Sequence, residues 1–298
     1  MTVPPSTKHG KSQTVEFLSN GSKIRGVLRL PQGQGPFPIV IAGHGFGALK
    51  EWAIPYLVDA LVEAGIAGLY FDYRNFGDSE GTPREEVAHH GRVEDWRSAI
   101  SFATSIPEVD PQQIGTWGTS LGGKDVLVVA SLDPRVKVVV TQTPAITFFP
   151  ERAARMAGYG DDLTRFYQEL AEDHKNRTLG GNPRYLPWVR EAGDDSKIAF
   201  LDTLNDAERR NYKGRVTIQS YYPISLVDIT PLFDLLRPIP ILFILAEDDH
   251  LSGQREAYEA IKEPKSLVFI KGDHWAPYTT SKEAATRAAK EWFVKHLS

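Results

Sequence analysis

The sequence predicts an α/β fold in which a mostly parallel central sheet is flanked by helices and an inserted helical cap interrupts the chain. Short apolar runs alternate with helical patterns along the first half and again near the end, as in right-handed crossovers between parallel strands. A charged, glycine-containing stretch separates these two parts. The chain has 298 residues, 41% hydrophobic and 24% charged, a balance that suits one large buried core.

The spacing of apolar residues indicates each element in order. Residues 14–18 and 23–30 alternate around Ser19-Asn20-Gly21-Ser22 and predict a hairpin. Residues 38–42 and 67–71 are continuous apolar runs, typical of strands buried on both faces, with helical spacing between them over residues 51–64. Further strands are expected at residues 114–117, 136–140, 239–245 and 267–270, and further helices at residues 85–105, 121–130, 254–261 and 282–296.

The interruption is interpreted as an insertion within one domain, because the strand–helix pattern continues on both sides of it. Residues 1–146 and 232–298 are expected to form the core. Residues 147–231 are expected to form the inserted helical cap, a substrate-selecting lid with short helices at residues 162–173 and 194–210.

Composition excludes several classes of function. Lys and Arg number 34 against 38 Asp and Glu, a net charge of -4, so no basic surface for nucleic acid is expected. The chain has no cysteine, which excludes disulfides, thiolate metal sites and a cysteine nucleophile. No apolar stretch approaches the roughly 20 residues of a membrane span, and the polar N-terminus does not suggest a signal peptide. A cytoplasmic protein is expected.

Ser120 is the candidate nucleophile. It lies in Gly118-Thr119-Ser120-Leu121-Gly122, between an expected strand and an expected helix. A sharp strand-to-helix turn needs small residues on both sides of the serine and presents its hydroxyl above the sheet edge. An alternative and compatible interpretation is that Thr119 or Ser120 caps the helix.

A serine hydroxyl needs a base, and the base needs an acid that orients it. His274 follows the expected strand at residues 267–270, and Asp248 and Asp249 follow the one at residues 239–245. The order serine, acid, histidine, each in a loop after a strand, fits this chemistry. His274 is therefore the candidate base, and either aspartate can supply the acid.

The oxyanion of an acyl-transfer reaction needs two hydrogen-bond donors. The backbone N–H of Leu121, directly after the serine, is one candidate. Gly43-His44-Gly45-Phe46-Gly47 follows an expected strand, and its glycines allow the Phe46 N–H to approach the serine closely. His44 is interpreted as a hydrogen-bonding residue that holds this loop.

Together, residues 44–47, 72–81, 118–122 and 272–274 and Asp249 resemble the α/β-hydrolase superfamily over residues 14–297. The chain is similar to the dienelactone hydrolase and X-prolyl peptidase or cocaine-esterase-like groups, and especially to fungal and bacterial hydrolases and acyltransferases that act on polyketides. The resemblance implies an α/β-hydrolase fold, Phe46 as an oxyanion donor and Asp249 as the acid. Dienelactone hydrolases proper use a cysteine nucleophile, which is absent here, so their substrate does not carry over.

The leading hypothesis is a serine hydrolase that cleaves an ester, lactone or thioester of a neutral, moderately bulky apolar acyl substrate through an acyl-enzyme. A polyketide acyltransferase or a C–C bond hydrolase would use the same triad, and an aminopeptidase would also need an acidic site. A binding protein or cyclase is the alternative of another class, although a pure binder needs no intact triad. No cofactor and no metal are expected, and the terminal helix and the cap are candidate surfaces for a homodimer. The candidate substrate-binding residues, which could also form the cap's own core, are Phe148, Phe149, Trp188, Tyr221 and Tyr222.

Overall fold

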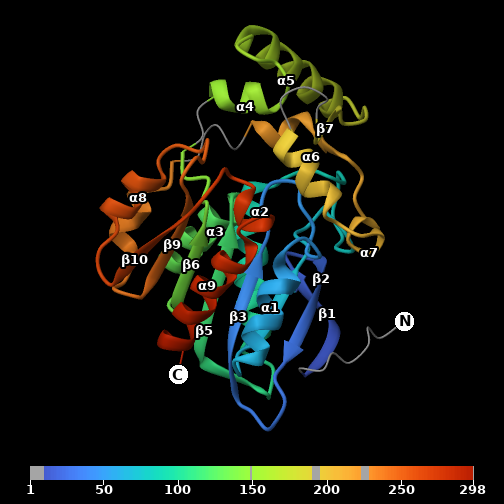
Figure 1. The fold of residues 1–298 in the computed structure, drawn as a ribbon. Helices are drawn as coiled ribbons and strands as arrows, with labels where there is room; N and C mark the ends of the chain where they lie inside the picture. The colour runs from blue at the N-terminus through green and yellow to red at the C-terminus, as the bar shows by residue number, and fades with distance from the viewer. Residues whose placement is uncertain (1–9, 148–149, 190–194, 223–227, 298) are drawn as a thin grey trace.

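The computed structural model describes residues 10–147, 150–189, 195–222 and 228–297. An eight-stranded sheet has the order β1-β2-β4-β3-β5-β6-β9-β10 (Figure 1). The hairpin strands β1 and β2 are antiparallel, and β2 also pairs antiparallel with β4. The other neighbouring strands run parallel to one another, in the order β4, β3, β5, β6, β9 and β10. The predicted α/β-hydrolase fold is confirmed. The strands are β1 (Lys11–Ser19), β2 (Ser22–Leu30), β3 (Phe37–Gly43), β4 (Ala67–Phe71), β5 (Val109–Thr119), β6 (Val136–Gln142), β9 (Ile241–Ala246) and β10 (Lys265–Ile270).

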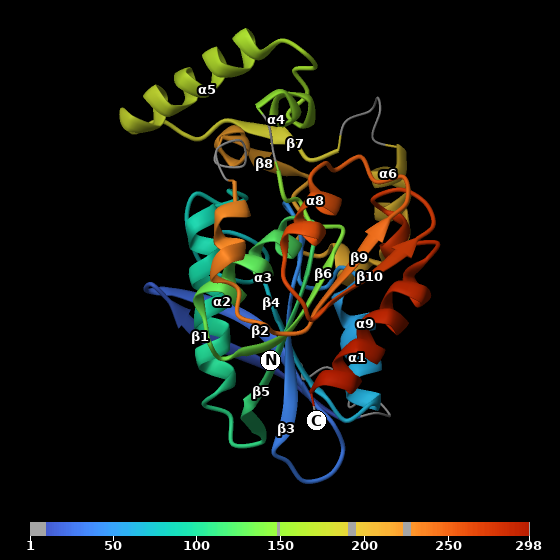
Figure 2. The same ribbon diagram turned by 90° about the vertical axis from the view of Figure 1, so that its left-hand side faces the viewer.

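Helices cover both faces of the sheet, as Figure 2 shows. Successive residues of a strand point to opposite faces, so Ile39 and Ile41 of β3 join the core cluster under α2 and α3, whereas Val40 and Ala42 join the cluster under α1 and α9. This explains why the central strands read as unbroken apolar runs. The helices of the core are α1 (Ile54–Glu63), α2 (His89–Ala103), α3 (Leu121–Leu132), α8 (Gln254–Ala260) and α9 (Lys282–His296).

The predicted helix at residues 85–105 begins later than its spacing suggested. Glu85 has a φ of 57°, its N–H donates to the carbonyl of Asn75, and its carbonyl accepts from the N–H of Thr217. These contacts with distant loops hold residues 85–88 out of the helix, and α2 starts at His89. The helix expected at residues 194–210 is also divided, because Asn205 caps a second, short helix through a capping box with Glu208.

The described parts of residues 147–231 lie over the edge of the sheet where the parallel strands end (Figure 1). The apolar residues Phe166, Val216 and Ile218 of this segment share one buried cluster with Leu49 and Leu121 of the core loops, so the segment packs directly onto the sheet edge. None of the helices in the described ranges is long and apolar enough to cross a membrane. The elements of this segment are α4 (Pro150–Met156), α5 (Leu163–Thr178), β7 (Tyr185–Pro187), α6 (Asp195–Asp202), α7 (Asp206–Arg209), β8 (Arg215–Thr217) and the 3₁₀ helix η1 (Ile218–Tyr221).

Candidate active site

Ser120 occupies a strained turn between β5 and α3. Its φ of 55° and ψ of -119° lie in a region that L residues rarely adopt. A Cβ atom on Gly118 would come 2.0 Å from the carbonyl oxygen of Gly122, and one on Gly122 would come 2.6 Å from that of His44. The glycines around the serine are therefore required by the closeness of the backbone. The Ser120 side chain makes no capping hydrogen bond to α3, so its helix-cap interpretation fails.

His274 lies between Ser120 and Asp249. Its Nε2 is 3.1 Å from Ser120 Oγ, and its Nδ1 is 3.0 Å from Oδ2 and 3.1 Å from Oδ1 of Asp249. The ionised carboxylate can only accept, so Nδ1 carries the imidazole proton and Nε2 is left to accept the proton of the serine hydroxyl. The three groups come from the loops after β5, β9 and β10, whose carboxyl ends share one edge of the sheet.

Asp249, rather than Asp248, faces the histidine. Burial acts to raise the pKa of Asp249, but hydrogen bonds from His274, Gln254 and the Leu251 N–H outweigh it and hold the pKa below its usual value. Gln254 Nε2 lies 3.0 Å from Oδ2, and the Leu251 nitrogen lies 2.8 Å from Oδ1. Asp248 is exposed. Gln254 was missed in the sequence, where a glutamine at the start of a helix carries no signal for this contact.

The loop after β3 approaches the serine closely. A Cβ atom on Gly45 would lie 2.9 Å from the Cβ of Ser120 and 3.4 Å from its Oγ. In the described part of the chain, no backbone acceptor pairs with the N–H of Phe46 or of Leu121, so both amides are free to bind an oxyanion. His44 is buried and lies 3.1 Å from the Gly45 carbonyl through Nδ1. Burial lowers its pKa well below the usual value, so it stays neutral.

A cavity of about 660 Å³ has Ser120 and His274 in its wall. Of the candidate substrate-binding residues, Trp188 and Tyr221 line this cavity, whereas Tyr222 is not among the lining residues and remains 47% exposed. Phe148 and Phe149 lie outside the described residues. Further aromatic side chains in the wall, which the sequence did not single out, are Trp52, Phe200, Trp275 and Tyr278.

Charged side chains also reach this cavity, which the sequence did not indicate. Arg152 and Arg155 come from α4, and Lys197 comes from α6, where its Nζ donates to the Trp188 carbonyl at 3.0 Å. Asp195 and Asp273 line the cavity as well. The aromatic wall therefore meets a polar, charged border.

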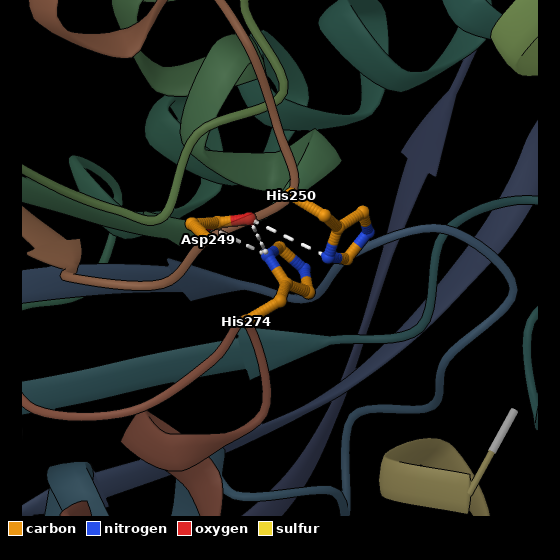
Figure 3. Close-up of side chains that lie close together, drawn as sticks. All are labelled: Asp249, His250 and His274. Atoms are coloured by element: carbon orange, nitrogen blue, oxygen red, sulfur yellow. Dashed lines mark hydrogen bonds and ion pairs between the residues drawn. The ribbon is translucent and has the colours of Figure 1, made fainter.

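Among the residues that the structure describes, two groups of side chains have the composition of a cation site. In the first, Glu51, Asp72 and Asp78 lie close together, but the ammonium group of Lys50 stands 2.6 to 2.7 Å from all three carboxylates and already supplies the positive charge. The second consists of Asp249, His250 and His274 (Figure 3).

A family model described as alpha/beta hydrolase fold matches residues 38–280. The chain belongs to the α/β-hydrolase family. This α/β hydrolase is 30% identical to a thiohydrolase of Aspergillus aculeatus over 88% of this chain and 87% of that protein. It is also 30% identical to a polyketide transferase of Stachybotrys chlorohalonatus over 86% of this chain and 87% of that one.

Solved structures agree with this assignment. The crystal structure of an α/β hydrolase from Penicillium sp. sh18 superposes with a TM-score of 0.81 at 25% identity, and the match covers 96% of this chain and 99% of that one. The homologues named thiohydrolase and acyltransferase support an enzyme that hydrolyses or transfers acyl groups. The candidate triad of this α/β hydrolase therefore occurs in a chain whose named relatives are enzymes.

Proposed function

We propose that this α/β hydrolase is a serine hydrolase that cleaves an ester, lactone or thioester of a moderately bulky apolar acyl substrate through an acyl-enzyme. The observation that carries the proposal is the continuous hydrogen-bond chain from Ser120 through His274 to Asp249, which opens into a cavity with an aromatic wall. A nucleophile, its base and an orienting acid within hydrogen-bond reach are the geometric signature of covalent acyl transfer.

The proposed reaction uses these groups in two stages. His274 Nε2 removes the proton of Ser120 Oγ as the oxygen attacks the carbonyl carbon, and the N–H groups of Phe46 and Leu121 bind the oxyanion that forms. His274 then returns the proton to the leaving alcohol or thiol, which leaves an acyl-enzyme. Water then attacks this ester with the same histidine as base, the bond between the acyl carbon and Ser120 Oγ breaks, and His274 returns the proton to Oγ as the acid leaves. Asp249 stabilises the imidazolium at both stages.

The cavity supports an apolar acyl group of moderate size. Its volume falls within the range of small-molecule sites, and rings such as Phe200 and Trp275, stacked with their centroids 5.1 Å apart, form an apolar surface for it. We assign Trp188 and Tyr221 to substrate binding on the same ground. The segment at residues 147–231 supplies Trp188, Phe200 and Tyr221 to the wall, which supports its role as a cap that selects the substrate.

Acyl transfer to an alcohol is the second candidate. It is favoured by the similarity to a polyketide transferase over 86% of this chain, and it differs only in the group that resolves the acyl-enzyme. The same triad serves both reactions, so an added acceptor alcohol distinguishes them by the ratio of ester product to free acid.

Hydrolysis of p-nitrophenyl esters from acetyl to dodecanoyl tests the proposal. We expect Ser120→Ala to lower kcat by about 10⁴-fold or more, while Ser101→Ala, which changes an exposed serine of α2, keeps wild-type turnover. A fluorophosphonate should add one adduct to the wild-type protein and none to Ser120→Ala. Retained turnover or labelling in Ser120→Ala would contradict the assignment of the nucleophile. Ligand binding without turnover on any ester, thioester or acceptor would favour a binding protein or cyclase.

A further inference from the structure

The Asp249 carboxylate faces two imidazole rings, and both lie on the same side of it (Figure 3). Nδ1 of His274 lies 3.0 Å from Oδ2, and Nδ1 of His250 lies 3.6 Å from Oδ1. The centroids of the two rings are 5.0 Å apart, and the ring planes are inclined at 69° to each other. The proposed triad uses only one of these histidines, so His250 has no role in the reaction described above.

We propose that Asp249, His250 and His274 form a binding site for a borderline divalent cation such as Zn²⁺, and that the bound ion switches the hydrolase off. Two imidazoles and a carboxylate are a ligand set that Zn²⁺ takes in proteins, often with a water as the fourth ligand. The proposal that the cation binds depends on geometry alone, whereas the proposal that it inhibits the enzyme rests on the proposed catalytic roles.

The distances fit such a site with small adjustments. Zn²⁺ bonds of about 2.1 Å in a tetrahedron place neighbouring ligand atoms about 3.4 Å apart. The carboxylate oxygens stand 3.0 Å and 3.6 Å from their respective imidazole nitrogens, and all three ligating atoms lie within 4.8 Å of one another. Rotation of the His250 side chain can close the remaining gap, because this side chain is 56% exposed.

The surroundings provide both support and access. Gln254 and the Leu251 N–H already orient the carboxylate, as outer hydrogen bonds do for metal ligands. His250 lines the cavity together with His274, so an ion can arrive from the same space as the substrate and complete its coordination with water.

Occupation would reverse the tautomer that catalysis needs. A metal can bind Nδ1 of His274 only through its lone pair, so the proton now on Nδ1 moves to Nε2 and the ring remains neutral. Nε2 then donates instead of accepting and cannot take the proton of Ser120. Inhibition follows without any change in the serine itself, and removal of the ion restores the original tautomer.

Calorimetric titration of Ser120→Ala with zinc sulfate tests binding separately from activity. We expect one site in this protein, and adding His250→Asn should weaken binding by at least about tenfold, since even loss of a residue that only supports a ligand costs 10- to 100-fold. His90→Asn, which removes an exposed histidine of α2, is the matched control and should leave the affinity unchanged. Equal Zn²⁺ affinity with and without His250 would overturn the proposal.

Ester hydrolysis by the wild-type protein tests the inhibition. Zn²⁺ should lower turnover at least tenfold and EDTA should restore it, whereas Mg²⁺, which prefers six oxygen ligands, should have no effect. For the wild type, His250→Asn and His90→Asn, turnover with Zn²⁺ is compared with the turnover of the same protein in EDTA. Zn²⁺ bound through His250 without loss of turnover would refute the tautomer argument. A wild-type protein inactive on every ester would count against the proposed function, while the titration would still decide the metal site.

Discussion

Replacing Asp249 by asparagine tests how the histidine is oriented. The substitution keeps the shape of the side chain and changes one oxygen into an NH₂ group. The Leu251 N–H, 2.8 Å from Oδ1, can only donate, so it retains the remaining oxygen of the asparagine at that position. The new NH₂ group then takes the place of Oδ2, 3.0 Å from His274 Nδ1. The Gln254 amide, which donates to Oδ2 in the wild type, can rotate by half a turn and present its oxygen to this NH₂ group.

This exchange reverses the hydrogen bond to the imidazole. The NH₂ group donates to Nδ1, which must now accept, so the neutral ring carries its proton on Nε2 and turns that proton toward Ser120. The base is thereby lost, together with the negative charge that stabilises the imidazolium. In serine proteases the equivalent change lowers kcat about 10⁴-fold, or about 5.4 kcal/mol of activation free energy, and we expect a similar loss here.

The assay compares kcat on a p-nitrophenyl ester for the wild type, Asp249→Asn and Asp248→Asn. Asp248 is exposed, so its variant should remain within twofold of the wild type. A thermal melt of each variant separates loss of fold from loss of chemistry. A kcat for Asp249→Asn within tenfold of the wild type, or a larger loss for Asp248→Asn, would refute the assignment of the acid.

Three further substitutions probe the loop, the carboxylate and the buried histidines. Gly45→Ala should lower kcat about 100-fold, the cost of one oxyanion donor, because its Cβ would come 2.9 Å from that of Ser120; wild-type kcat would contradict this. Gln254→Leu should lower kcat about tenfold with KM unchanged, since a hydrogen bond to a charged group contributes roughly 1.5 kcal/mol; a change confined to KM would contradict a positioning role. Burial lowers the pKa of His89 to about 2, so from pH 6.5 to 5 the unfolded chain binds a proton that the folded chain excludes. The free energy of unfolding should fall by about 1.6 kcal/mol over this range. In urea titrations across this pH range, His89→Gln should remove the contribution of His89 to the fall in the free energy of unfolding. An equal fall in the wild type and in His89→Gln would contradict it.

Local patterns predicted the sheet well because its strands are buried on both faces. The apolar run at residues 38–42 is an example, since residues 39 and 41 pack under one helix layer and residues 40 and 42 pack under the other. The serine turn was equally visible, since Gly118 and Gly122 leave room that no larger residue would. The convergence of Ser120, Asp249 and His274 follows from the topology, because loops after parallel strands meet at one edge.

Features that depend on contacts between distant segments could not be predicted in the same way. The start of α2 is set by Glu85, which contacts Asn75 and Thr217, and no local pattern encodes such a partner. The cavity wall combines Trp52, from the loop before α1, with Phe200, from α6; their ring centroids are 5.7 Å apart although the residues are far apart in sequence. Aromatic residues in the cap could be counted in the sequence, but only tertiary packing decides which of them face the serine.

In the proposed reaction, the fate of the acyl-enzyme depends on the space beside the serine, because the same triad serves both hydrolysis and transfer. A cavity of about 660 Å³ has the volume of about twenty water molecules at roughly 30 Å³ each, enough for an acyl group and a second molecule together. Rings such as Trp188 and Trp275 offer water few hydrogen bonds, whereas Lys197, which also lines this space, carries a strongly hydrated ammonium group. An acyl group that covers the rings therefore displaces the weakly held water first. Whether water or an alcohol then attacks is decided by what fits between that acyl group and the charged side chains, most of which come from residues 147–231. Selectivity between hydrolysis and transfer can thus change through this segment while Ser120, His274 and Asp249 remain as they are.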